Sequence, residues 1–324
     1  MVSFADVKAA YERIRRASIQ TPIMTSLTAN RLTNCSIFFK CENFQRIGAF
    51  KFRGAYNAIS QLTEKEQQRG VITHSSGNHA QAVALAAKML GIKATIVMPE
   101  NSSPVKIAAT RDYGATIEFC TPNMEMRERT VKQLIKKHEF ILIHPYDDSR
   151  VIAGAGTAAY ELISEVGAID MILAPVGGGG LISGTSIATK GLCPKALVYA
   201  IEPKGADDAY RSFKSGKIVP SENPNTIADG LRTSLSKLTF SIIQQKVDEI
   251  ITVTDDEIID AMRFLWERMK LVIEPSGAVP LAGLFKIKET IDNQRIGIIL
   301  SGGNVDLSKF FEEYKTTHSL NPSN

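Results

Sequence analysis

The chain of 324 residues lacks several features that would indicate particular classes of protein. No apolar run is long enough to cross a bilayer, and the N-terminus carries an early acid instead of a signal peptide's apolar core. Basic and acidic residues are mixed throughout, with a formal net charge of only +4 and no basic run, which disfavours nucleic acid as a partner. These absences favour a soluble cytoplasmic protein of the size of an enzyme.

Cysteine is also scarce. The four cysteines are Cys35, Cys41, Cys120 and Cys193, and their spacing does not fit a metal site, so we expect reduced thiols. Hydrophobic residues make up 44% of the chain, which is enough for a substantial core. The length favours two lobes over one small core.

Short apolar strands alternate with helical segments along most of the chain, which is typical of an α/β fold with parallel sheets. Residues 70–147 contain four such strands with intervening helices, enough for a small open sheet. Strand-and-helix units flank this region on both sides. We therefore predict two open twisted sheets, in a large domain of residues 1–69 and 148–324 and a smaller domain of residues 70–147 inserted into it.

Three segments of small residues follow predicted strands. They are the four glycines at 177–180, residues 75–79 (Ser-Ser-Gly-Asn-His) and residues 301–304 (Ser-Gly-Gly-Asn). Consecutive glycines allow several N–H groups to converge on one anion at a helix N-terminus, and ligands of open α/β sheets bind beyond the carboxyl ends of strands. A phosphate site is therefore the first hypothesis, with a flexible loop and an ordinary helix cap as the alternatives.

A lysine, Lys51, stands between two phenylalanines just before a helix predicted over residues 54–61. An apolar setting lowers the pKa of an amine and suits it to Schiff-base chemistry. A lone lysine is more often a solvated surface residue, so this residue by itself leaves both interpretations open.

Taken together and in this order, Lys51 in Phe-Lys-Phe-Arg-Gly, Ser-Ser-Gly-Asn-His, the tetraglycine and Ser-Gly-Gly-Asn resemble the pyridoxal-phosphate enzymes of fold type II. Within them the likeness is to the serine racemases and the serine and threonine dehydratases, and it runs from about residue 4 to about residue 307. The resemblance implies that Lys51 binds the cofactor, pyridoxal 5′-phosphate, covalently. The other cofactor-binding residues that it implies are Phe50, Asn78, Gly177, Gly178, Gly179, Gly180, Glu274 and Ser301.

The implied activity is racemisation of serine together with α,β-elimination of serine to pyruvate and ammonia. Lys51 and Ser76 would be the catalytic residues, acting on opposite faces of the substrate. The implied substrate-binding residues are Ser75, Ser76, Asn78, His79, Arg127 and Thr233. No function is assigned to His74 or His144.

Two further ligands are implied by the same resemblance. Glu202, Asp208 and the backbone carbonyl of Ala206 would bind magnesium, manganese or calcium, which prefer such hard oxygen ligands; a solvated acidic turn is the alternative. ATP would bind as an allosteric effector at the interface of a homodimer. Its implied residues are Ser26, Leu27, Thr28, Arg46, Ile47, Gln81, Tyr113, Lys270 and Asn304, of which Arg46 and Ile47 depart from the Lys-Thr of animal relatives.

Other departures and alternatives remain. Ala49 replaces a serine common in the dehydratases, and Tyr146 replaces an asparagine of the mammalian racemases. One alternative function is a dehydratase of threonine, serine or threo-3-hydroxyaspartate that does not racemise. Another is a non-catalytic nucleotide-binding regulatory protein in which Lys51 has no role. The chain ends soon after Asp306, so we expect neither a C-terminal regulatory domain nor feedback by isoleucine.

Overall fold

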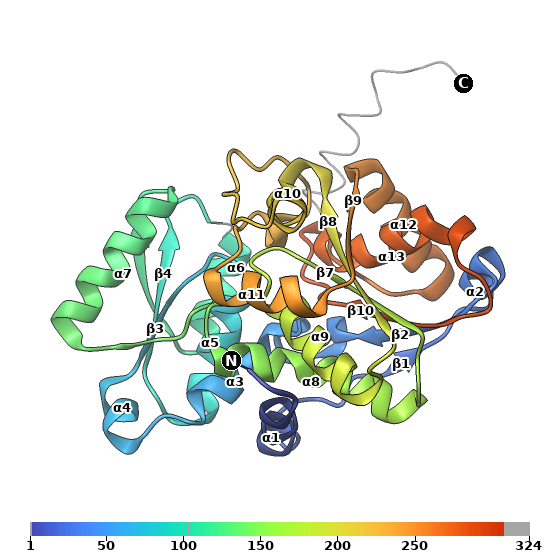
Figure 1. The fold of residues 1–324 in the computed structure, drawn as a ribbon. Coiled ribbons are helices and arrows are strands. Elements are labelled where there is room, and N and C mark those ends of the chain that lie inside the picture. The colour runs from blue at the N-terminus through green and yellow to red at the C-terminus, as the bar shows by residue number, and fades with distance from the viewer. Residues whose placement is uncertain (1, 103, 308–324) are drawn as a thin grey trace.

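The computed structural model describes residues 2–102 and 104–307, which form two separate sheets (Figure 1). The larger sheet has six strands in the order β1-β2-β10-β7-β8-β9, parallel except for β1, which pairs antiparallel with β2. Its strands are β1 (Ile23–Met24), β2 (Ser36–Cys41), β7 (Met171–Pro175), β8 (Leu197–Pro203), β9 (Glu249–Val253) and β10 (Arg295–Leu300).

The smaller sheet has four parallel strands in the order β5-β4-β3-β6 and lies on the left in Figure 1. Its strands are β3 (Val71–His74), β4 (Ala94–Pro99), β5 (Thr116–Cys120) and β6 (Ile141–Leu142). The predicted α/β fold with two open sheets is therefore confirmed. The domain limits at residues 70 and 147 stay a prediction, since an apolar cluster of this lobe also includes Ile47, Phe52 and Ile59 from the preceding segment.

Helices cover both faces of each sheet. They are α1 (Phe4–Ile14), α2 (Leu27–Thr33), α3 (Lys51–Ile59), α4 (Glu64–Arg69), α5 (Asn78–Met89), α6 (Pro104–Asp112), α7 (Met124–His138), α8 (Ser149–Val166), α9 (Gly180–Leu192), α10 (Asp208–Ser215), α11 (Lys237–Lys246), α12 (Asp255–Met269) and α13 (Pro275–Ile287). Short 3₁₀ turns are η1 (Glu42–Phe44), η2 (Arg46–Gly48), η3 (Lys204–Ala206), η4 (Asp229–Leu231) and η5 (Lys288–Thr290). None of the helices described is both long and apolar enough to span a membrane.

The large sheet is the middle layer of three. Helices α8 and α9 pack on one face, and α12 and α13 on the other, so that β7 is buried along its whole length. A strand covered on both faces needs apolar residues at every position, and this explains the unbroken run Met-Ile-Leu-Ala-Pro. The same layering exposes only the ends of the strands, where loops can form a site.

Helices α3, α8 and α9 approach each other unusually closely. A Cβ added to Gly154 of α8 would lie 2.6 Å from the backbone oxygen of Arg53 in α3, and one added to Gly184 of α9 would lie 2.4 Å from the backbone oxygen of Ile152 in α8. Glycine at these positions therefore brings the three helices into backbone contact. The helix predicted to begin at residue 54 in fact begins at Lys51, because Gly54 is tolerated inside it as part of this contact.

The substitution Gly184→Ala tests this close approach. Alanine favours a helix by about 1 kcal/mol over glycine, so helix propensity alone would stabilise the protein. The added methyl group must instead push α9 away from α8, and overpacking of this kind costs about 1–3 kcal/mol. We expect a lower free energy of unfolding in urea, and an unchanged or higher value would show that the helices can separate without cost.

Candidate active site

The amine of Lys51 is partly buried at the start of α3, where the sequence places a phenylalanine on either side. Its Nζ donates a hydrogen bond to the backbone oxygen of Pro145 at 3.0 Å and lies 5.1 Å from the centre of the Phe50 ring. Burial lowers the pKa of Lys51 to about 8, although the charge of Glu274 opposes this shift. The predicted apolar setting of this amine is thus present.

The tetraglycine forms the turn between β7 and α9. Gly179 has a φ of +87°, and an added Cβ on it would lie 2.8 Å from Thr239. A Cβ on Gly177 would lie 2.8 Å from the Cα of Leu231. Only glycine fits this turn, and the first turn of α9 leaves N–H groups without partners inside the helix. The turn has the form of an anion cradle.

Tyr146 links the tetraglycine to Lys51. An added Cβ on Gly178 would lie 2.3 Å from the Tyr146 ring, and one on Gly180 would lie 2.9 Å from the Cβ of Tyr146. The preceding residue, Pro145, accepts the hydrogen bond from Lys51. The Lys51 amine and the glycine turn therefore both lie against one short segment after β6, residues 145–146.

A chain of amides connects the two sheets beside this segment. Asn304, after β10, donates through Nδ2 to the backbone oxygen of Ile47 at 2.6 Å and to Oδ1 of Asn78 at 2.8 Å. Asn78, at the start of α5, donates in turn to Oε1 of Glu274 at 2.8 Å. Ser301 accepts a hydrogen bond through its backbone oxygen from the N–H of Phe50 at 3.0 Å. Hydrogen bonds thus join four of the predicted cofactor-binding residues in two pairs, Asn78 with Glu274 and Phe50 with Ser301.

Glu274 is almost fully buried, with 6% of its surface exposed. Burial, together with the charge of Asp229, raises the pKa of Glu274 to about 8, while the hydrogen bond from Asn78 lowers it in part. At neutral pH most of this carboxyl is therefore protonated. A neutral acid and a partly deprotonated amine can coexist here without two opposite charges buried in an apolar site.

The N-terminus of α5 carries the other predicted polar residues. The Ser75 hydroxyl accepts from the N–H of Gly77 at 3.2 Å, and Ser76 is partly buried beside it. His79 is buried, its Nε2 donates to the backbone oxygen of Ile143 at 3.0 Å, and its Nδ1 has no partner among the described residues. Burial holds the pKa of His79 well below its usual value, so the ring is neutral.

Two histidines that the sequence left without a function also lie near the amine. The rings of His74 and His144 pack edge to face at 5.9 Å, and His144 packs the same way on Tyr146 at 4.8 Å. Burial and the charges of His144 and Arg127 lower the pKa of His74 to about 4, and burial also lowers that of His144, on which Lys51 acts as well. Their positions at the ends of β3 and β6 were the signal that could have identified them.

Arg127 and Thr233 are the two remaining residues that were predicted to bind the substrate. Arg127, on α7, is close enough for its charge to help lower the pKa of His74 and to oppose the rise that burial causes in the pKa of Cys120. Its Nε is buried without a hydrogen-bond partner in the described part of the chain. Thr233 is partly buried two residues before Leu235, which packs against Gly179. No contact between either residue and Lys51 is seen within residues 2–102 and 104–307, so their substrate-binding role stays a prediction.

The predicted cation site has the expected carboxylates. Both Glu202 and Asp208 are fully buried; Glu202 accepts from the N–H groups of Ala209 and Tyr210, whereas neither oxygen of Asp208 has a hydrogen-bond partner among the residues described. Burial raises the pKa of Asp208 to about 6. An unpaired buried carboxylate beside a second one fits a hard cation. Within the described ranges, no group of three or more His, Cys, Asp or Glu side chains is arranged so that it could hold a metal ion by itself.

The residues predicted to bind ATP are only partly brought together. Asn304 contacts Ile47 directly, and Ile47 and Tyr113 pack in one apolar cluster. Ser26 caps the N-terminus of α2, and Leu27 beside it is 80% exposed. Thr28 follows in α2, Gln81 is buried in α5, Arg46 donates to the backbone oxygen of Ala17, and Lys270 ends α12. ATP binding stays a prediction.

Comparison with known proteins identifies the class. The family described as "Pyridoxal-phosphate dependent enzyme" matches residues 14–302, nearly the whole chain. The protein therefore belongs to the pyridoxal-phosphate dependent enzymes, with the two-sheet architecture of fold type II.

Similar proteins narrow the comparison. Serine racemase of Dictyostelium discoideum is 51% identical over 312 residues, which cover 95% of this chain and 96% of that protein. L-threo-3-hydroxyaspartate ammonia-lyase of Saccharomyces cerevisiae is 48% identical over 309 residues, 95% of each chain. The crystal structure of the Dictyostelium racemase superposes with a TM-score of 0.91, at 50% identity, over 94% of this chain and 99% of that one. The chain thus belongs to the serine racemase and dehydratase family.

The residues present fit the cofactor of this family. The glycine turn offers N–H groups where a Cβ would clash, which suits a phosphate, and the Lys51 amine is held nearby with a lowered pKa. Gly177, Gly178, Gly179 and Gly180 would hold the phosphate, and Lys51 would form the covalent bond. Phe50, Asn78, Glu274 and Ser301 would surround the ring.

The raised pKa of Glu274 predicts a specific pH dependence of stability. The carboxyl loses its proton near 4.5 in the unfolded chain but near 8 in the folded protein, so the folded state binds more protons between these values. The free energy of unfolding therefore falls as the pH rises through this window, by on the order of 1 kcal/mol per pH unit. Glu274→Gln keeps the oxygen that accepts from Asn78 and removes the titration.

Urea unfolding of both proteins without cofactor, at a series of pH values, measures this effect. We expect the wild-type free energy of unfolding to fall relative to that of Glu274→Gln between pH 4.5 and about 8. Parallel curves would mean that Glu274 ionises normally in the fold.

Proposed function

We propose that this protein is a pyridoxal-phosphate dependent serine racemase that also eliminates water from serine, giving pyruvate and ammonia. The likeness to the Dictyostelium serine racemase along 95% of the chain carries the proposal. The arrangement of Lys51, the glycine turn and the Asn78–Glu274 pair supports it. Product analysis with L-serine and D-serine tests it: D-serine and pyruvate are both expected from L-serine, and a protein that forms neither would overturn it.

Bound pyridoxal phosphate withdraws electrons from the Cα of an amino acid attached through its nitrogen and so acidifies the Cα hydrogen. Lys51, with a pKa of about 8, is then a suitable base for that proton near neutral pH. Ser76, at the N-terminus of α5, would exchange a proton on the opposite face, which inverts the configuration. Ser75, Asn78, His79, Arg127 and Thr233 would hold the substrate. Ser301 would face the ring nitrogen as a neutral partner.

A second activity has specific support. Relatives named L-threo-3-hydroxyaspartate ammonia-lyase from Saccharomyces cerevisiae and from a Pseudomonas species are 48% and 47% identical to this chain. These ammonia-lyases are nearly as similar to this chain as the serine racemases are, so sequence identity does not distinguish the two activities. A dehydratase of threo-3-hydroxyaspartate that does not racemise is therefore the alternative, and threo-3-hydroxyaspartate and L-threonine belong in the product analysis.

The proposal extends to the protein's other ligands, its oligomeric state and its location. Glu202, Ala206 and Asp208 would hold magnesium, manganese or calcium as a structural ion, which the unpaired Asp208 carboxylate supports. ATP would bind around Ile47 and Asn304 as an effector. We further propose a cytoplasmic homodimer. The small-molecule substrate would be an amino acid, as the names of the relatives suggest.

Ser76→Ala tests the two-face assignment. Loss of the Ser76 hydroxyl removes the proton donor of one face, so D-serine formation from L-serine should become undetectable while pyruvate formation stays within a few-fold of wild type. Chiral chromatography and a pyruvate assay measure the two products, and Ser75→Ala is the comparison, since loss of a proposed substrate-binding residue should lower both products alike. Racemisation that continues in Ser76→Ala would refute the role of Ser76.

Asp208→Asn tests the cation site. Magnesium that binds only the folded protein raises the melting temperature in a concentration-dependent way. We expect this rise in the wild type and its loss in Asp208→Asn, since the amide has no charge for the ion. Asp207→Asn is the matched control because Asp207 is only partly buried and pairs with Arg211. Equal shifts in all three proteins would place the ion elsewhere; manganese and calcium are tested in the same way.

A further inference from the structure

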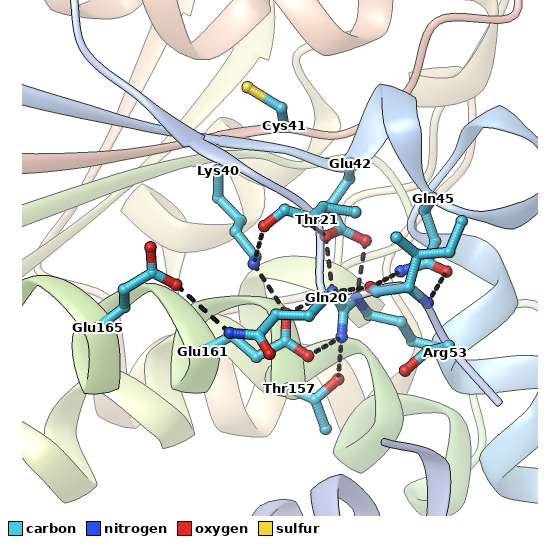
Figure 2. A network of polar contacts seen from close by, with 12 residues as sticks. Gln20, Thr21, Lys40, Cys41, Glu42, Gln45, Arg53, Thr157, Glu161 and Glu165 are labelled. Carbon is cyan, nitrogen blue, oxygen red and sulfur yellow. Dashed lines mark hydrogen bonds and ion pairs between the residues drawn. The ribbon is translucent and has the colours of Figure 1, made fainter. Parts of the chain in front are cut away.

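Four charged side chains are buried together between β2, α3 and α8 (Figure 2). Lys40, Glu42 and Arg53 have no exposed surface, and Glu161 is 5% exposed. The two positive and two negative charges balance. Charged residues are almost never buried this fully unless they are paired, and we call this group the buried charge cluster.

Arg53 is the centre of the buried charge cluster. Its Nε and Nη2 donate to the two oxygens of Glu42 at 2.7 and 2.8 Å, and its Nη1 and Nη2 donate to the two oxygens of Glu161, both at 2.7 Å. Nη1 also donates to the Thr157 hydroxyl at 3.2 Å, and Lys40 pairs with Glu161 at 2.7 Å. Bidentate pairs on two sides hold a planar guanidinium in one orientation.

Arg53 lies two residues after Lys51 on the same helix. Each residue of an α-helix advances by about 100°, so the two side chains leave α3 about 200° apart, on opposite faces. A rotation of α3 that breaks the pairs of Arg53 must therefore also swing Lys51 away from Pro145. The cluster fixes the direction of the amine from the far side of the helix.

Backbone contacts continue this constraint toward the glycine turn. Gly154 places α8 against the backbone of Arg53 and Gly54, and Gly184 places α9 against the backbone of α8. Because α9 begins at the tetraglycine, the three helices form a stack with Lys51 at one end and the turn at the other. The distance between amine and turn is then set by backbone contacts.

We propose that Arg53 is a positioning residue, which through the buried charge cluster holds α3 in the rotation that directs Lys51 toward the glycine turn. The proposal rests on the covalent role proposed for Lys51. Its nearest alternative is that the cluster only stabilises the fold, as any buried ion pair does when its partners are present.

Arg53→Lys keeps the positive charge and removes the fork of donors. The first measurement uses the protein without cofactor: the pH dependence of amine labelling at Lys51, read by mass spectrometry of the peptide that contains it. In the wild type half-maximal reactivity is expected near pH 8, and in Arg53→Lys it should move toward the ordinary value of 10.5 as the amine becomes solvated. An unmoved labelling curve would overturn the proposal.

The second measurement adds pyridoxal phosphate and compares total bound cofactor with the fraction fixed to residue 51 by borohydride. Arg53→Lys should bind the phosphate but show a smaller fixed fraction, with kcat for serine lowered by up to about 100-fold, the scale of a 1 Å misplacement, and KM little changed. An undiminished fixed fraction would contradict the positioning role.

Two further variants separate positioning from stability. Ile258→Ala removes a buried side chain of α12 far from the cluster, and such changes cost about 2–5 kcal/mol. It should lower stability without moving the labelling curve; a shift as large as that of Arg53→Lys would mean that lost stability alone explains it. If Arg53→Lys does not fold, Thr157→Val removes the hydroxyl that accepts from Arg53 and that donates to the backbone oxygen of Gly154. It leaves the ion pairs of Arg53 in place and should move the curve in the same direction by less.

These outcomes also distinguish the two proposals. A wild-type protein that fixes no cofactor at residue 51, yet shows the labelling shift in Arg53→Lys, would refute the function and keep the positioning role. A wild type that fixes the cofactor, with Arg53→Lys indistinguishable from it, would refute the positioning role alone.

Discussion

Keeping one primary amine largely out of water is the constraint on which the rest of this site depends. A lysine in water is protonated at neutral pH and is a poor nucleophile, whereas burial lowers the pKa of Lys51 to about 8. Burial also removes the water that would solvate an ionised Glu274, and the pKa of this carboxyl therefore rises to about 8. Both shifts reduce the charge buried in this site: at neutral pH the Glu274 carboxyl is mostly protonated, and Lys51 has a larger fraction of neutral amine than an ordinary lysine.

The site also requires two sheets to meet at fixed distances. Asn78, at the start of α5, is hydrogen-bonded to Asn304, which follows β10, and to Glu274, which precedes α13. On the large sheet the glycine turn is held by Tyr146, whose ring leaves no space for a Cβ at Gly178. One connection is made of hydrogen bonds and the other of close packing, and the packed one involves the same short segment after β6 that accepts the hydrogen bond from Lys51.

The sequence predicted the residues whose chemistry is visible in their type, and it missed those whose role comes from packing. Four glycines in a row have no common use other than a tight turn, so the cradle after β7 was predictable, and the ordered motifs gave Lys51 through resemblance. His74 and His144 were missed because edge-to-face contact depends on which strands are neighbours. Lys40 and Arg53 look like surface residues in sequence, since charge alone does not show that they will be buried with partners on η1 and α8. Gly54 made α3 seem to start three residues late, because a helix interior seldom contains glycine unless another backbone lies against it.

The position of the carboxylates after β8 explains why an ion there would be structural. Burial raises the pKa of Asp208 to about 6, while the nearby Ser221 hydroxyl and Leu235 backbone, which make no hydrogen bond to this carboxylate within the described residues, act to lower it. Leu235 also packs its side chain on Gly179 of the glycine turn. A cation held by Asp208 would therefore order the segment around Leu235, and through the contact of Leu235 with Gly179 it would affect how the glycine turn holds the phosphate. Such an ion would change how firmly the cofactor is held, and the proton chemistry would stay with the Lys51 amine, which donates to the backbone oxygen of Pro145.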